Sequence, residues 1–127
     1  MFARVKKSRH EQYLQIVENY REGGKVRQRM VLYVGHYGSI EEALRLMPQE
    51  LRRWRRRRSG IGDNEFRQKE AEYLHRVIES TDKRLGALRR LVADHPDMVE
   101  RDRERAERHR RRQAEARRAW LEAGAVW

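Results

Sequence analysis

The stretch NYREGGKVRQRMVLYVG, from Asn19 to Gly35, decides the fold because it places two glycines between two segments that alternate apolar and polar residues. Alternation with a period of two is typical of a β-strand, and a Gly-Gly pair readily adopts the positive φ values of a type I′ turn. The stretch therefore predicts a β-hairpin that turns at Gly23 and Gly24.

A two-residue turn also predicts the register of this hairpin. We expect these cross-strand pairs: Glu22 with Lys25, Tyr20 with Arg27, Glu18 with Arg29, Val17 with Met30, and Tyr13 with Val34. One face of the hairpin then collects most of the apolar residues, namely Tyr13, Val17, Val26, Met30, Leu32 and Val34. We expect a helix to cover this face.

Residues 2 to 8 read as a third strand that returns through a turn at residues 8 to 11. The first part of the chain therefore predicts a three-stranded antiparallel meander over about residues 2–34. After Gly35 the hydrophobic period changes to that of a helix. Ser39 and Glu42 form a capping box at its start. Its apolar stripe comprises Ile40, Ala43, Leu44, Met47, Leu51 and Trp54.

The remaining chain predicts helices separated by breaks. We expect Pro48 to divide the first helical segment into two short helices, and RRRRSGIGD, residues 55–63, to form a break. Two long helices follow, one ending before Pro96 and one running from there to about Glu122, and they form a hairpin or a dimerisation arm. The fold class is thus α+β, with a head at residues 1–58 and a charged helical tail at residues 59–127.

The charge points to a polyanionic partner. The chain has 31 Lys and Arg against 20 Asp and Glu, a net charge of +11. Residues 1–60 carry 15 basic and 6 acidic side chains, whereas residues 61–127 carry 16 and 14. We therefore expect nucleic acid to meet the first half of the chain. The expected phosphate contacts are Lys6, Lys7, Arg9, Arg27, Arg29, Arg52, Arg53, Arg55, Arg56, Arg57 and Arg58.

The densest basic segment, LRRWRRRR at residues 51–58, could instead be a solvated helical face, with Trp54 completing the buried stripe. Arg29 has an alternative partner in Glu18, which the register places opposite it. The last helix has only alanines as non-polar residues between Glu100 and Arg118. It ends in an apolar group, Trp120, Leu121, Val126 and Trp127, which could dock on a second copy.

Catalytic signals are few. The sequence contains no cysteine, which excludes disulfides and thiol nucleophiles, and its five histidines lack the spacing of metal ligands. His36 and Tyr37, which stand between Gly35 and Gly38, are the only pair of side chains in a predicted loop where a functional role would be expected. We predict no enzymatic activity, no cofactor and no metal. Without a signal-peptide pattern or a membrane span, a cytoplasmic protein that does not bind membranes is expected.

The segment YLQIVENYREGGKVRQRMVLYVGHYGSIEEAL, Tyr13 to Leu44, resembles the N-terminal leader of bacterial insertion-sequence transposases of the DDE type. In that family, three metal-binding carboxylates on a ribonuclease-H-like sheet perform the chemistry. This chain shows no strand pattern after Gly35, so the resemblance implies the leader without the nuclease. The leader in turn implies DNA handling.

Together these observations predict a non-catalytic DNA-binding protein of accessory, regulatory or remnant character. The alternative is a basic helical protein that self-associates, as a homodimer through the C-terminal helices, or binds RNA or ribosomes.

Overall fold

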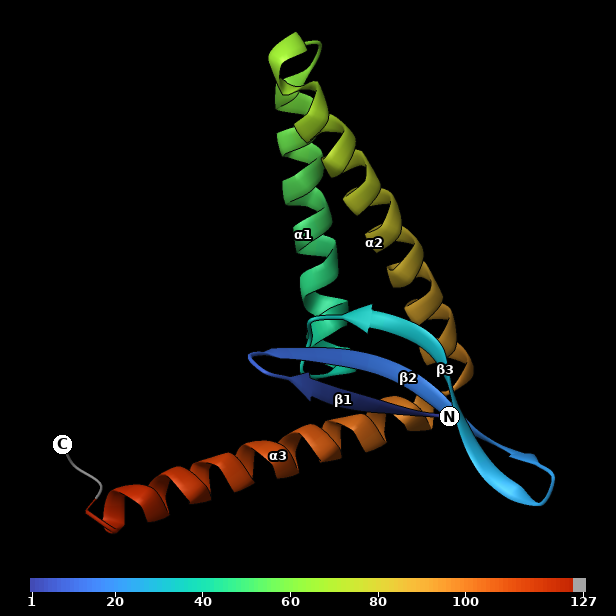
Figure 1. Ribbon diagram of the computed structural model, residues 1–127, viewed down its shortest axis with the longest axis vertical. Helices are drawn as coiled ribbons and strands as arrows, with labels where there is room; N and C mark the ends of the chain where they lie inside the picture. Colours follow the sequence, from blue (N-terminus) through green and yellow to red (C-terminus); the bar gives the residue numbers. More distant parts are fainter. Residues whose placement is uncertain (125–127) are drawn as a thin grey trace.

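The computed structural model describes residues 1–124 and contains a small sheet and three long helices (Figure 1). The strands are β1 (Phe2–Ser8), β2 (Glu11–Glu22) and β3 (Lys25–Gly35), paired antiparallel in the order β1-β2-β3. The helices are α1 (Ile40–Ile61), the 3-10 turn η1 (Glu65–Arg67), α2 (Gln68–Asp94) and α3 (Pro96–Glu122). The predicted meander and the α+β class are confirmed.

The hairpin register is correct near the turn and wrong at its far end. Glu22 lies opposite Lys25 and Val17 lies opposite Met30, as predicted. Irregularities then shift the register, so that Leu14 lies opposite Gly35. The predicted pairing of Tyr13 with Val34 is therefore wrong, because extra residues in β3 bend the strand as bulges do.

These bulges also change which face forms the core. Leu14, Ile16 and Val34 are fully buried, whereas Val26 and Met30 are 63% and 54% exposed. The predicted apolar face is thus correct in part: Val17 and Val34 are buried and Leu32 packs against the core, but the prediction is wrong for Val26 and Met30. The reason is that β1 pairs only with residues 11–17 of β2, so the turn half of the hairpin extends beyond the sheet and the helices (Figure 1).

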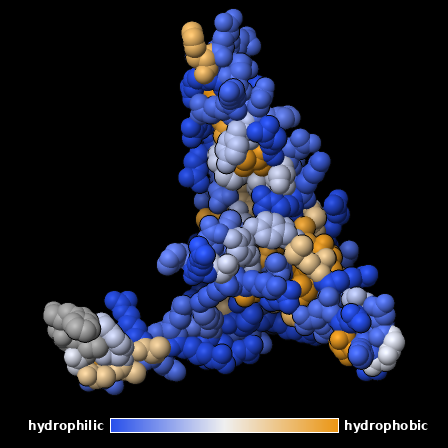
Figure 2. Space-filling view, in the orientation of Figure 1, coloured by the Kyte–Doolittle hydropathy of each residue, from blue (hydrophilic) through white to orange (hydrophobic). Residues whose placement is uncertain are grey.

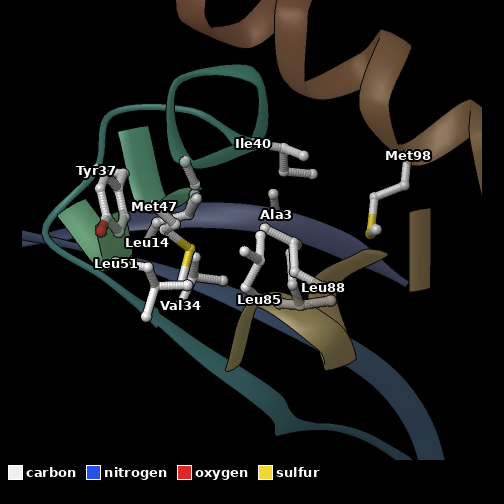
Figure 3. Close-up of a cluster of buried hydrophobic side chains, with 12 residues drawn as sticks. Ala3, Leu14, Val34, Tyr37, Ile40, Met47, Leu51, Leu85, Leu88 and Met98 are labelled. Atoms are coloured by element: carbon white, nitrogen blue, oxygen red, sulfur yellow. The ribbon is translucent and has the colours of Figure 1, made fainter. Parts of the chain in front are cut away.

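Three helices cover the core face of the sheet (Figure 3). The first half of α1 contributes much of the cover, and α2 and α3 supply the rest. The core cluster contains Ala3, Leu14, Ile16, Val34, Tyr37, Ile40, Ala43, Met47, Leu51, Leu85, Leu88 and Met98. It therefore joins residues on both sides of the expected boundary after residue 58.

Helix α1 is longer and less interrupted than its sequence suggests. Its start is as predicted, since the Ser39 Oγ accepts a 3.1 Å hydrogen bond from the Glu42 N–H. Pro48 lies inside the continuous helix, so the predicted division is wrong. Burial of Met47 and Leu51 on either side of it offsets the roughly 3 kcal/mol cost of an internal proline. The break expected over residues 55–63 likewise begins only at Gly62, where φ is 53°.

The hairpin of long helices is formed by α1 and α2, which run side by side, rather than by α2 and α3 (Figure 1). Trp54 packs against Ile61, Ala71 and Leu74 between these two helices, which confirms its predicted place in the buried stripe. Helix α3 passes beside β1 and then extends as a single arm. Its last turn carries Trp120 and Leu121, each 52% exposed, whereas Val126 and Trp127 lie outside the described residues.

Within residues 1–124, no helix combines the length and the apolar character needed to cross a membrane.

Candidate nucleic-acid interface

The predicted phosphate contacts fall into three separate groups. The first lies at the β1–β2 turn, where Lys6, Lys7 and Arg9 are exposed. Arg9 has a φ of 53° in this turn. The Lys7 Nζ lies 3.5 Å from the His109 Nε2, so α3 runs close to this group. The β2–β3 turn, which carries the second group, lies at the opposite end of the sheet (Figure 1).

In the second group, both arginines are paired within the hairpin. Arg27 forms a 3.5 Å ion pair with Glu22, and Arg29 pairs with Glu18 as the register predicts. The Arg29 guanidinium also lies 5.5 Å from the centre of the Tyr20 ring. Because Glu22 and Glu18 already neutralise the charges of Arg27 and Arg29, little net positive charge remains in this group for a phosphate.

The third group is the arginine run of α1, which the helix divides among different faces. Arg55 forms a 3.3 Å ion pair with Asp82 of α2. The Arg57 Nε donates a 2.8 Å hydrogen bond to Glu70, which also accepts from Arg67 at 3.0 Å. Hydrogen bonds from Arg67 and Arg57 lower the pKa of the Glu70 carboxyl, which favours its charged form.

The remaining arginines of the run differ in exposure. Arg58 is half-buried and lines a hollow beside His75 and Arg76 of α2. Arg52, Arg53 and Arg56 are exposed.

A stripe of arginines follows the outer face of α1. Arg45, Arg52 and Arg56 are exposed and spaced at i, i+7 and i+11, which aligns them on the side of the helix opposite the core. We call them the outer arginines. Within residues 1–124, neither they nor Arg53 have a carboxylate partner. Sequence reasoning missed Arg45 because it stands outside the arginine run, although helical periodicity relates it to Arg52.

Beside this stripe, α1, α2 and the β3–α1 loop enclose a cleft of about 490 Å³. We call it the arginine cleft. Three arginines, Arg53, Arg57 and Arg84, line it together with Trp54. Arg84 of α2 was not predicted as a site residue, and no signal in the sequence separates it from the other charged residues of its helix.

The loop pair singled out in the sequence, His36 and Tyr37, lies at this cleft. Tyr37 is buried and donates a 2.8 Å hydrogen bond to Glu50 of α1. Burial and this hydrogen bond raise the pKa of Tyr37 well above its ordinary value, so the hydroxyl stays neutral. His36 is exposed, and its ring centre lies 4.8 Å from that of Tyr13.

The face of the molecule drawn in Figure 2 is mostly hydrophilic. In the part of the chain that the structure describes, no three histidines, aspartates or glutamates are grouped so that they could hold a metal ion.

Comparison with known proteins places the first half of the chain. No curated protein and no solved structure matches this chain. The family described as IS1634 family transposase, N-terminal domain, matches residues 3–69, which include α1, η1 and all of the sheet except Phe2. This match covers more than half of the 127 residues and includes the segment whose resemblance to transposase leaders the sequence had suggested. The chain therefore belongs to the family of IS1634 family transposase N-terminal domains.

Proposed function

We propose that this chain binds duplex DNA through the outer face of α1 and supplies no catalytic residues of its own, as an accessory, regulatory or remnant relative of insertion-sequence transposases. The observation that carries the proposal is a set of four exposed arginines of α1 without carboxylate partners: the outer arginines Arg45, Arg52 and Arg56 and, at the edge of this face, Arg53.

The length of this set suits a phosphate backbone. A helix rises about 1.5 Å per residue, so Arg45 and Arg56 are about 16 Å apart along the axis of α1. One strand of B-form DNA carries about five phosphates over that length. Guanidinium groups bind phosphate oxygens through two parallel hydrogen bonds. Four such contacts would orient the protein on the duplex without reading its sequence.

A binding role without catalysis is supported by the state of the carboxylates. Six of the side-chain carboxylates lie within 4 Å of an arginine: Glu18, Glu22, Glu41, Glu70, Asp82 and Asp102. A carboxylate whose oxygens contact a guanidinium group is already engaged in that ion pair, so these six are not placed to exchange a proton with a ligand.

The test is a binding titration with a blunt duplex at two salt concentrations. With four phosphate contacts, affinity should fall roughly 100-fold between 50 and 200 mM salt. The variant Arg52→Gln/Arg56→Gln should weaken binding and reduce the slope of log K against log salt by about 2. The matched control, Arg27→Gln/Arg29→Gln, removes the same charge from the hairpin, where both arginines are already paired, and should change the slope less. Equal effects of the two variants would contradict the assignment to α1.

Self-association is a second candidate, and the end of α3 favours it. Beyond residue 106 the described part of this helix is exposed along its whole length, yet it carries Trp120 and Leu121 on its last turn. An apolar group on an otherwise charged arm suits contact with a second copy. Light scattering should then give twice the mass of the 15.5 kDa chain, and Trp120→Glu/Leu121→Glu should return the monomer.

A further inference from the structure

The arginine cleft has features that a contact with duplex phosphates does not require. Its floor is formed where β3 ends, at Gly35, whose φ is 139°. A Cβ atom at this position would lie 2.9 Å from the Arg84 Nη1 and 3.0 Å from the Tyr37 ring. The absent side chain therefore leaves room for the Arg84 guanidinium to approach the loop backbone.

Arg84 is held in place by neutral groups. Its guanidinium donates to the Val34 carbonyl oxygen and, at 3.0 Å, to the Thr81 Oγ1. Neither partner is negatively charged, so the positive charge of Arg84 is not neutralised. A cation fixed in this way is preorganised for an anion, because little side-chain freedom is lost when the anion binds.

The charge balance of the cleft favours an anion. Three guanidinium groups line it, and Glu50 is the one carboxylate among its described lining residues. Glu50 already accepts the hydrogen bond from Tyr37, and Arg57 is shared with Glu70. Arg53 and Arg84 thus remain to bind an anion, and Arg53 lies next to the outer arginines along α1.

Trp54 adds a flat apolar surface to this cationic site. Part of the side chain packs in the cluster with Ile61, Ala71 and Leu74, and part lines the cleft. Aromatic rings that stand beside arginines stack nucleic-acid bases. A paired base in a duplex is stacked on both sides and cannot reach a ring inside a cleft, whereas an unpaired nucleotide can. The volume of about 490 Å³ is of the size that binds one small ligand.

We propose that the arginine cleft captures one unpaired nucleotide of a DNA strand, with its phosphate on Arg53 and Arg84 and its base stacked on Trp54. This inference rests on the proposed function, because the outer arginines would bring the duplex from which the unpaired strand extends. The protein would therefore prefer a junction between duplex and single strand over a blunt duplex.

The experiment compares the full chain on a blunt duplex and on the same duplex with a four-nucleotide single-stranded extension that carries 2-aminopurine. The extension should tighten binding about tenfold, which is the scale of one stacked base, and the 2-aminopurine fluorescence should be quenched. Trp54→Leu keeps apolar packing in the helical hairpin but removes the aromatic face, and it should abolish both effects. Trp54→Phe should restore most of both.

Two further variants separate the cleft from the rest of the surface. Arg53 is also one of the four arginines assigned to the duplex, so Arg53→Gln should weaken binding to both DNAs and should in addition remove the preference for the extension. Tyr73→Leu, at an exposed aromatic residue of α2 outside the cleft, should keep this preference. Equal affinity for the two DNAs, or an unchanged preference in Trp54→Leu, overturns the inference. Blunt-duplex binding that still depends on Arg52 and Arg56 would then leave the proposed function standing, whereas no binding to either DNA removes both. If a free mononucleotide bound as tightly as the duplex with the extension, the cleft would be a site for a small nucleotide, and the inference that it binds a nucleotide within a DNA strand would be wrong.

Discussion

The Oδ2 atom of Asp102 in α3 accepts a 2.7 Å hydrogen bond from the backbone N–H of Ile40, the first residue of α1. Asp102 is only 3% exposed. Its Oδ1 accepts from Arg105, which in turn donates a 2.9 Å hydrogen bond to the Gly38 carbonyl oxygen. A carboxylate from the last helix therefore stabilises the positive N-terminal end of the first one, across 62 residues of chain.

Replacing Asp102 with alanine should destabilise the protein by about 3 kcal/mol. The change leaves the Ile40 N–H without its acceptor and Arg105 without its partner, and removing one member of a buried charge pair is costly. The free energy of unfolding from urea titration checks this. Asp102→Asn keeps an acceptor oxygen and should lose roughly half as much. A loss below about 1 kcal/mol for the alanine variant would show that α3 contributes little to anchoring α1.

Gly35→Ala should destabilise the fold by about 2 kcal/mol, because it combines a strained φ with contacts to Arg84 and Tyr37. The matched control is Gly86→Ala in α2, where a Cβ would meet nothing within 4 Å. That change should stabilise the helix by up to about 1 kcal/mol. The melting temperatures of the two variants should therefore move in opposite directions. A shift of the same sign in both would contradict the role given to Gly35.

Residue patterns predicted the sheet, its order and α3 because these depend on local features: alternation, a Gly-Gly turn, and a proline at a helix start. These patterns gave wrong predictions where contacts between residues far apart in the sequence determine the structure. Val34 is buried because the end of β3 packs in the core beneath the helices, Met30 is exposed because the turn half of the hairpin extends beyond them, and Pro48 remains inside α1 because its neighbours are buried.

In the candidate site, too, local sequence features identified some residues, whereas others are brought together only by the fold. Composition and local runs identified Arg52, Arg53 and Arg56, and the loop glycines drew attention to His36 and Tyr37. Only the folded helices bring Arg53 and Arg84 to one cleft. These two residues are 31 positions apart in the sequence, and no local pattern relates them.

Glu70→Gln should increase the affinity for duplex DNA. The substitution releases Arg57 and Arg67, which both donate to this carboxylate, and makes them free to contact phosphates. The slope of log K against log salt should steepen by about 1 to 2. Glu79→Gln is the matched control, because it removes the same charge from a carboxylate whose partners are His75 and Lys83 on its own helix. An equal increase in both variants would mean that net charge alone is responsible.

The stability of the protein should decrease with rising pH above about 10, in part because of Tyr37. Burial and the hydrogen bond to Glu50 raise the pKa of Tyr37 in the folded state above its ordinary value of 10.0. The folded protein therefore keeps a proton that the unfolded chain releases, so this contribution to stability is fully present below pH 10 and is lost as the pH rises. For one such group the loss between pH 9 and pH 11 is about 1 kcal/mol. Tyr37→Phe has no hydroxyl to titrate, so its free energy of unfolding should fall by about that much less over the same interval, as measured by urea titration at the two pH values. Parallel losses in the two proteins would show that Tyr37 ionises in the folded state as readily as in the unfolded chain.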